Sequence, residues 1–216
     1  MTPVATSPPR PAGNPEPGRP TGAPAPRGGG RRPELLAAAV HVVSDEGLRG
    51  LTHRAVDRRA GLPEGTCSAY LRTRGALLVA LAEHVGGILE AGVTRLAGDL
   101  QGCAGDADAV AAAVTDLTTG CVRESAVVRA QAELSLEAGR RPELMEVFER
   151  WRHGLLATVE ELGRATGRQA PARDAAVVVA AVEGCLVTAV RLPGPEREQF
   201  LRDAVPPLVR ALHTGG

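Results

Sequence analysis

Apolar residues recur at steps of three and four along most of the chain after residue 30, which is the spacing of amphipathic helices. The first such stripe contains Leu36, Val40 and Val43, between Pro33 and Gly47. Proline suits the first position of a helix, and glycine commonly ends one. No segment shows the sustained two-residue alternation of a strand. The pattern therefore predicts an all-α protein whose first helix spans about residues 33–47.

The segment 51–78 predicts a short helix, a tight turn, a second short helix and the start of a long one. The hydroxyl of Thr52 can cap the first of these helices, and Gly61 can end it. The inward positions of this helix are Ala55, Val56 and Ala60, and its outer positions are His53, Arg54, Asp57 and Arg58. Two packed helices joined by a turn with glycine are the arrangement that places a helix in the major groove of DNA.

The second short helix of this segment is expected to begin at Pro63. Proline fixes the first helical φ, and Glu64 would then lie near the positive end of the helix dipole. Cys67 and Leu71 can face inward together, which leaves the small residues at the front of the helix free to approach DNA.

The remaining pattern predicts helices only. They span about residues 76–97, 106–124, 127–138, 142–161, 171–191 and 196–212. Pro206 and Pro207 should kink or split the last helix. We expect a helix-turn-helix head at 31–76, joined by a long helix to a larger helical domain at 77–216.

Charge separates these two parts. The chain of 216 residues has no net charge, but residues 1–76 hold eleven arginines and six acids, whereas residues 77–216 hold fourteen arginines and nineteen acids. A basic front and an acidic remainder suit a DNA-facing module joined to one that does not touch DNA. Aromatic residues make up only 2% of the chain, so its core must be built from Ala, Val and Leu, which favours closely packed helices.

Residues 1–30 predict a disordered tail. They hold nine of the 17 prolines, six glycines and hardly any large apolar residue, so they cannot bury enough surface to offset the entropy of ordering. The arginines of the tail would either follow a DNA backbone or simply be solvated, and the second alternative is the commoner one.

The sequence contains no motif for metal binding, catalysis, secretion or membrane insertion. The four cysteines, at 67, 103, 121 and 185, form no CxxC pair and lie at no metal-ligand spacing to histidine. No catalytic motif, cofactor loop, signal peptide or apolar run long enough for a membrane is present. We therefore expect a cytoplasmic protein that is not an enzyme and has no metal, cofactor or membrane partner.

A set of residues at fixed spacing over about residues 31–80 resembles the TetR family of one-component repressors, and the LTHRAVDRRAGLPEG stretch looks like an actinobacterial-type branch of it. The carrying residues are Ala37, Ala38, Gly47, Leu51, Thr52, Val56, Ala60, Gly61, Gly65, Thr66, Tyr70, Arg74, Leu77 and Leu78. Pro63, Cys67, Ser68 and Leu71 depart from the commonest family pattern, and Ser68, which takes the place of a frequent Tyr, would make a shorter phosphate contact.

The resemblance implies a DNA site. By family position, the phosphate-binding candidates are Thr52, Thr66, Ser68, Tyr70 and Arg74. Base reading would fall to the exposed side chains, with Arg54 as the best candidate because arginine pairs bidentately with guanine. Glu64 would accept from cytosine or only favour the helix dipole, and Gly65 and Arg72 complete the predicted site.

The resemblance also implies a homodimer, formed through the helices at 171–191 and 196–212, that binds a pseudo-palindromic operator on double-stranded DNA. A small molecule bound in the C-terminal domain would release it. The candidate ligand-binding residues are His84, Cys121, Glu133, Phe148, Trp151 and Glu183, and each has an ordinary alternative as a core or surface residue. An alternative function is a redox-responsive regulator that senses through Cys67 or Cys103.

Overall fold

The computed structural model of the chain describes residues 30–100, 105–165 and 171–214, and these form nine helices and no strand. The all-α prediction is confirmed. The helices are α1 (Arg31–Gly50), α2 (His53–Ala60), α3 (Thr66–Tyr70), α4 (Arg74–Asp99), α5 (Ala107–Arg123), α6 (Ser125–Ala138), α7 (Pro142–Ala165), α8 (Pro171–Ala189) and α9 (Gly194–Thr214). The predicted tail lies outside the described residues, except for Gly30.

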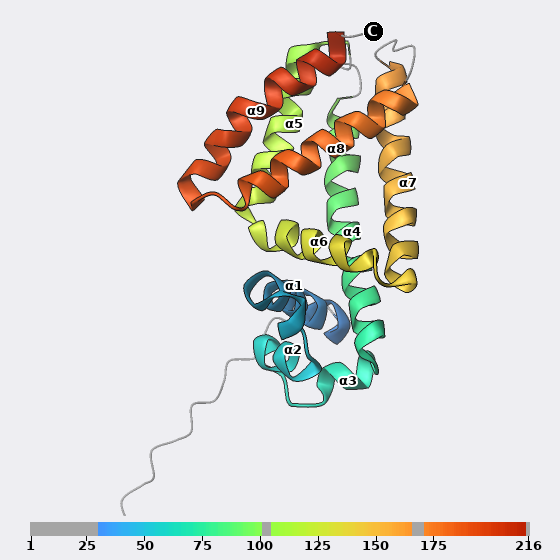
Figure 1. Cartoon of the computed structure of the whole chain (residues 1–216), viewed down its shortest axis with the longest axis vertical. Coiled ribbons are helices and arrows are strands. Elements are labelled where there is room, and N and C mark those ends of the chain that lie inside the picture. The colour runs from blue at the N-terminus through green and yellow to red at the C-terminus, as the bar shows by residue number, and fades with distance from the viewer. Residues whose placement is uncertain (1–29, 101–104, 166–170, 215–216) are drawn as a thin grey trace, which may run out of the picture.

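Helices α1 to α3 form a small head at one end of the molecule (Figure 1). Two glycines with positive φ punctuate it as the sequence predicts: Gly47 interrupts α1 with φ 68°, and Gly61 ends α2 with φ 66°. The hydroxyl of Thr52 accepts from the N–H of Ala55 at 3.1 Å and caps α2.

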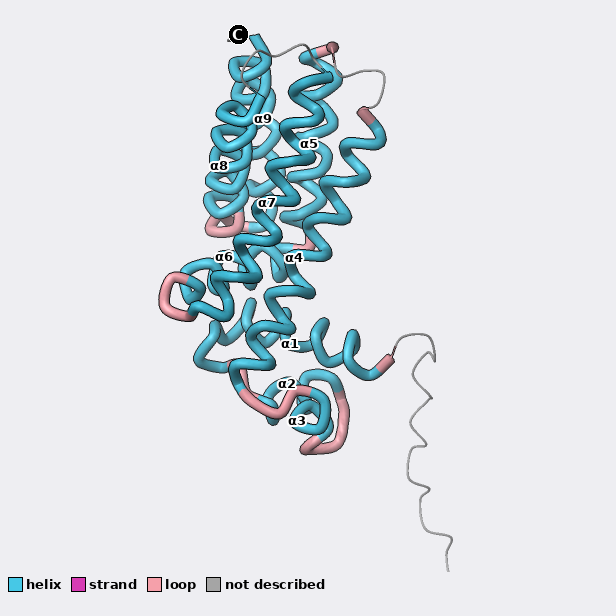
Figure 2. The backbone as a smooth tube through the Cα atoms, turned by 90° about the vertical axis from the view of Figure 1, so that its right-hand side faces the viewer, coloured by secondary structure: helices cyan, strands magenta, loops and turns pink. Residues whose placement is uncertain are grey.

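Helix α4 connects the head to the rest of the protein and runs through much of its length (Figures 1 and 2). The hydroxyl of Thr73 caps it by accepting from the N–H of Ala76 at 3.0 Å. By length and composition α4 is apolar enough to cross a membrane, with a mean hydropathy of 1.6. Its inward residues, among them Leu77, Leu81 and Val85, are buried in the head core, as in the core helix of a globular protein.

Helix α6 lies across the molecule between the head and the bundle of α5, α8 and α9, and α7 runs beside α4 (Figure 1). Asp106 begins the bundle as predicted, because its carboxylate accepts from the N–H groups of Asp108 and Ala109 at the start of α5. Helix α9 contains Pro206 and Pro207 but continues to Thr214, so the prolines do not split this helix, which was one of the two predicted effects.

The buried apolar residues form two clusters. The first unites the head helices and α4 with α6 and the start of α7, through residues such as Ala130, Leu134 and Leu144. The second joins Leu100 with α5, α8 and α9, and also includes Val122 and Val128. The head therefore shares its core with α6 and α7, so it cannot shift without disturbing the packing of those two helices.

We expect a large difference between two leucines of α6. Leu134 is fully buried in the first cluster, whereas Leu136 is 73% exposed. Leu134→Ala should lower the free energy of unfolding by about 2–5 kcal/mol, because it removes buried apolar atoms and leaves a cavity. Leu136→Ala, the matched control, should change it by less than about 0.5 kcal/mol. Urea denaturation checks both, and equal effects would contradict the core described above.

Candidate DNA-binding site

The predicted DNA-binding residues lie together on α2, α3, the turn between them and the start of α4. Most of their side chains are exposed: Thr52, Arg54, Glu64, Ser68, Tyr70, Arg72 and Arg74. Tyr70 is 52% exposed, although it is a large aromatic residue. A basic, exposed surface on two short helices offers phosphate contacts and a helix that can enter a groove.

The position of α3 depends on a buried carboxylate. Asp57, on α2, is fully buried. One of its oxygens accepts from the N–H of Gly65 at 2.8 Å, and the other accepts from the N–H of Cys67 at 2.7 Å. Both donors belong to the N-terminal end of α3, where backbone N–H groups lack helical partners. The carboxylate thus fixes the start of α3 against α2.

This geometry corrects two predictions. Asp57 was expected on the outer side of α2, but its carboxylate turns inward because the α3 N–H groups satisfy it there. The second short helix was expected to begin at Pro63, but α3 begins at Thr66. Gly65 precedes it with φ 93°, a left-handed conformation that belongs to no right-handed helix. Glu64 consequently lies in the turn rather than in the first helical turn.

Two further side chains hold the site together. The imidazole Nε2 of His53 lies 2.5 Å from the carbonyl oxygen of Leu71, which joins the start of α2 to the end of α3. The guanidinium of Arg74 donates to the carbonyl of Leu48 at 2.6 Å and also to that of Leu51. Arg74 therefore ties α4 to the end of α1, and its remaining N–H groups are those left for a phosphate.

Arg54 projects from α2 with a side chain that is 82% exposed, and its Nε lies 3.7 Å from the carboxylate of Glu64. An exposed pair of this kind contributes little to stability, so Arg54 can leave it when DNA approaches. The hydroxyls of Thr66 and Ser68 donate to the carbonyls of Pro63 and Gly65, at 2.6 and 2.9 Å.

The six predicted ligand-binding residues do not form one site. The rings of Phe148 and Trp151 meet edge to face, with centroids 6.3 Å apart. They pack against Ala82, Val85 and Gly86 on α4, around a space of only about 10 Å³. The two rings therefore fill this part of the protein, which leaves no room for a ligand there.

His84, Glu133 and Glu183 lie elsewhere. His84 is half-buried on α4, and burial, followed by nearby Arg32 of α1, lowers its pKa. Glu133 is exposed on α6, and its Oε2 would lie 3.8 Å from a Cβ added at Gly47, so it faces α1. Glu183 is half-buried on α8, where burial raises its pKa against the opposing effect of Arg152.

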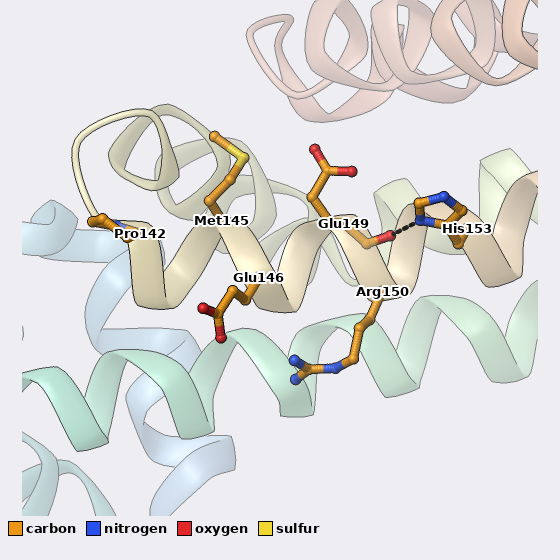
Figure 3. Close-up of a pocket in the computed structure, with 6 residues that line it drawn as sticks. All are labelled: Pro142, Met145, Glu146, Glu149, Arg150 and His153. Carbon is orange, nitrogen blue, oxygen red and sulfur yellow. Dashed lines mark hydrogen bonds between the residues drawn. The ribbon is translucent and has the colours of Figure 1, made fainter.

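Of the six predicted ligand-binding residues, all of which the structure describes, Cys121 alone lies on the wall of a sizeable cavity. This cavity, of about 370 Å³, lies between α4, α5 and α6. A second hollow, of about 780 Å³, lies on the outer side of α7 and is lined by Pro142, Met145, Glu146, Glu149, Arg150 and His153 (Figure 3). All six residues come from one helix, so this hollow lacks the converging walls of a ligand pocket.

Cys67 is poorly suited to redox sensing. Its side chain is fully buried on α3, and burial, followed by the nearby charge of Asp57, raises its pKa to about 11. The thiolate is the reactive form, and it is scarce at neutral pH in such a group. Cys103, the other predicted sensor, lies outside the described residues.

Comparison with known proteins identifies the class. Residues 105–215 match the family model described as "Tetracyclin repressor-like, C-terminal domain". This match covers half of the chain. It lies in the C-terminal part, for which the sequence analysis predicts helices but identifies no motif. The chain belongs to the TetR family of transcriptional regulators. No curated protein sequence matches it significantly.

Solved structures share the TetR-family fold with this chain. A transcriptional regulator from Rhodococcus sp. Rha1 has 20% identity and a TM-score of 0.73, over 85% of this chain and 96% of its own. A TetR-family member from Streptomyces coelicolor A3 has 24% identity and a TM-score of 0.57, over 82% and 99%. The multidrug-binding protein EbrR, complexed with ethidium, also has 24% and 0.57, over 82% and 98%.

Membership of the TetR family makes this chain a DNA-binding regulator, which confirms that part of the sequence prediction. The Asp57 carboxylate beneath α3 is a feature that the sequence prediction did not place there. Sequence reasoning missed it because an acid on a short helix beside arginines fits a solvated face equally well. Its spacing of eight residues to Gly65 was the only signal available.

We expect Asp57→Asn to loosen α3. An amide offers one acceptor oxygen in place of two, so one buried N–H loses its partner, and this should lower the free energy of unfolding by about 1–3 kcal/mol. Asp45→Asn is a suitable control, because it removes only the surface pair between Asp45 and Arg59 (2.7 Å) and should change stability by less than about 1 kcal/mol. Equal unfolding midpoints for Asp57→Asn and the wild type would contradict the role of this carboxylate.

Proposed function

We propose that this TetR-family protein is a cytoplasmic homodimeric repressor that a small molecule releases from a pseudo-palindromic operator. Residues 31–76 would act as the DNA-binding domain, and residues 77–216 as the domain for ligand binding and dimerisation. The observation that carries the proposal is the exposed surface of α2 and α3 with the arginines of α2 and those that follow α3, in which Asp57 holds the start of α3.

Within this face, different side chains suit different parts of DNA. The hydroxyls of Thr66 and Ser68, with Tyr70 and Arg72, lie at the exposed side of α3 and its end, where they suit phosphate contacts. Arg54 can turn toward DNA, because its side chain is 82% exposed and its ion pair with Glu64 is exposed as well. We assign base reading to Arg54, since a bidentate guanidinium distinguishes guanine.

A dimer would supply the second DNA-binding head. The described part of α8 exposes a stripe of small or apolar residues at helical spacing: Val177, Ala180, Gly184 and Thr188. Val177 is 47% exposed, although it is a β-branched apolar residue. Helix α9 packs beside α8 and exposes Gln199, Asp203 and Pro207. Small residues let helices approach closely, so this surface suits pairing with a second copy.

Release by a ligand would act through α4. This helix begins directly after α3 and also lines the 370 Å³ cavity, so one rigid element contacts both sites. A ligand that binds one position of α4 better than another shifts the equilibrium between them and changes the spacing of the two heads in a dimer.

DNA binding is tested with the full chain and the DNA upstream of its own gene, by fluorescence anisotropy over a range of salt concentrations. We expect affinity to fall steeply with salt, because phosphate contacts release counterions. Arg54→Ala should weaken operator binding by about 1–3 kcal/mol and relax the base preference. Arg140→Ala, an exposed arginine at the α6–α7 turn, should change nothing. A folded protein that binds no fragment in a salt-sensitive manner would refute the proposal.

Dimerisation is tested by Gly184→Arg. A Cβ added at Gly184 meets nothing within 4 Å, so the protomer should still fold. A charged side chain in the middle of the α8 stripe should convert the dimer to a monomer and weaken operator binding at least about tenfold, since one head reads only a half-site. Gly98→Arg, at an equally open position on α4, is the control. Light scattering after size exclusion reports the mass, and an intact dimer in Gly184→Arg would exclude this interface.

A further inference from the structure

The cavity between α4, α5 and α6 has a mainly apolar wall. Ile88 and Leu89 come from α4, Leu117 from α5 and Val127 from α6. Ile88 is 40% exposed, so a large apolar side chain borders this cavity without being covered. Gly120 of α5 contributes to the space, because a Cβ added there would meet nothing within 4 Å. An apolar ligand would cover this surface and gain the free energy of its burial.

The charged residues of the cavity are two acids and one base. Arg95 comes from α4, Asp116 from α5, and Glu124 from the residue that follows α5. None of these three takes part in an ion pair within the described residues. On the same wall, burial and, secondly, the charge of Glu124 raise the pKa of the Cys121 thiol. The cavity therefore favours positive charge.

We propose that this cavity binds a small apolar cation, whose hydrophobic body lies against Ile88, Leu89 and Leu117 and whose positive group faces Asp116 and Glu124. The proposal names the ligand class of the effector site and so rests on the proposed function. An anion would bind less well, because two carboxylates would repel it and only one guanidinium would attract it.

Occupation of this cavity would bear on the head through two helices. Helix α4 lines it and begins directly after α3, and α6 lines it and packs against α1. A ligand in this cavity therefore contacts α4 and α6, which are two of the helices that share the head core. This makes the cavity better placed than the hollow on α7, whose lining residues all come from that one helix.

The test is isothermal titration of the full chain, without DNA, with three probes of nearly the same shape: 1-methylquinolinium, uncharged 1-methylnaphthalene and the anion 1-naphthoate. We expect the cation to bind about tenfold more tightly than the uncharged probe, and the anion to bind most weakly. Asp116→Asn combined with Glu124→Gln should remove the preference for the cation and leave the affinity of the uncharged probe unchanged.

Gly120→Leu tests the location. The open space at Gly120 accepts the side chain, and leucine is a better helix former than glycine, so the variant should fold and fill the cavity. All binding should then be lost. Gly87→Leu is the matched control, since a Cβ at Gly87 also meets nothing within 4 Å but Gly87 does not line the cavity.

Absence of binding, equal affinities for the three probes, a preference for the anion, or full binding by Gly120→Leu would each overturn the inference. Because these titrations contain no DNA, their outcome is separate from that of the repressor proposal. A protein that binds the cation in the cavity but no operator would refute the proposed function alone. One that binds operator but shows no cation preference would refute the cavity assignment alone.

Discussion

The proposed DNA-binding surface depends on one buried carboxylate. Asp57 lies beneath α3 and accepts from the backbone N–H groups of Gly65 and Cys67, at 2.8 and 2.7 Å. A five-residue helix cannot hold its own position, because helices this short are unstable alone. The carboxylate supplies two charge-assisted hydrogen bonds where the α3 backbone lacks partners. This buried residue of α2 therefore helps to give the exposed side chains of α3 a defined direction.

The support of α3 extends from this carboxylate into the rest of the protein. His53 bonds to the carbonyl of Leu71, and Arg74 bonds to the carbonyls at the end of α1 and just after it. The head core then continues through Leu134 of α6 and Leu144 of α7. Because packed cores deform little, a displacement of α4 or α6 should reach the head as movement of a unit rather than as local loosening. This continuity gives a physical basis for the proposed control of the α2–α3 face from the cavity.

The sequence predicted the parts of this structure that follow from local rules. The spacing of apolar residues predicted the helices. Thr52 and Asp106 cap the N-termini of α2 and α5, and Gly61 ends α2, as their chemistry suggests. The sequence prediction was wrong where residues distant in the chain determine the local conformation. The side chain of Asp57 points inward because it accepts from N–H groups eight and ten residues further along the chain. Helix α3 begins at Thr66 rather than at Pro63, because the positive φ of Gly65 is incompatible with a right-handed helix. The ligand candidates were chosen by residue type, whereas the cavity is formed by the tertiary arrangement of three helices, so only Cys121 among them lies on its wall.

The central claim is that the α2–α3 face, held by Asp57, is the surface that meets DNA. Hydrogen–deuterium exchange of the full chain tests this most directly. The exchange is measured with and without an operator fragment taken from the DNA upstream of the protein's own gene. The account predicts that DNA slows exchange over α2, the following turn, α3 and the start of α4, with α5 and α7 unchanged. Protection confined to other helices, with the segment 52–74 unaffected, would contradict it.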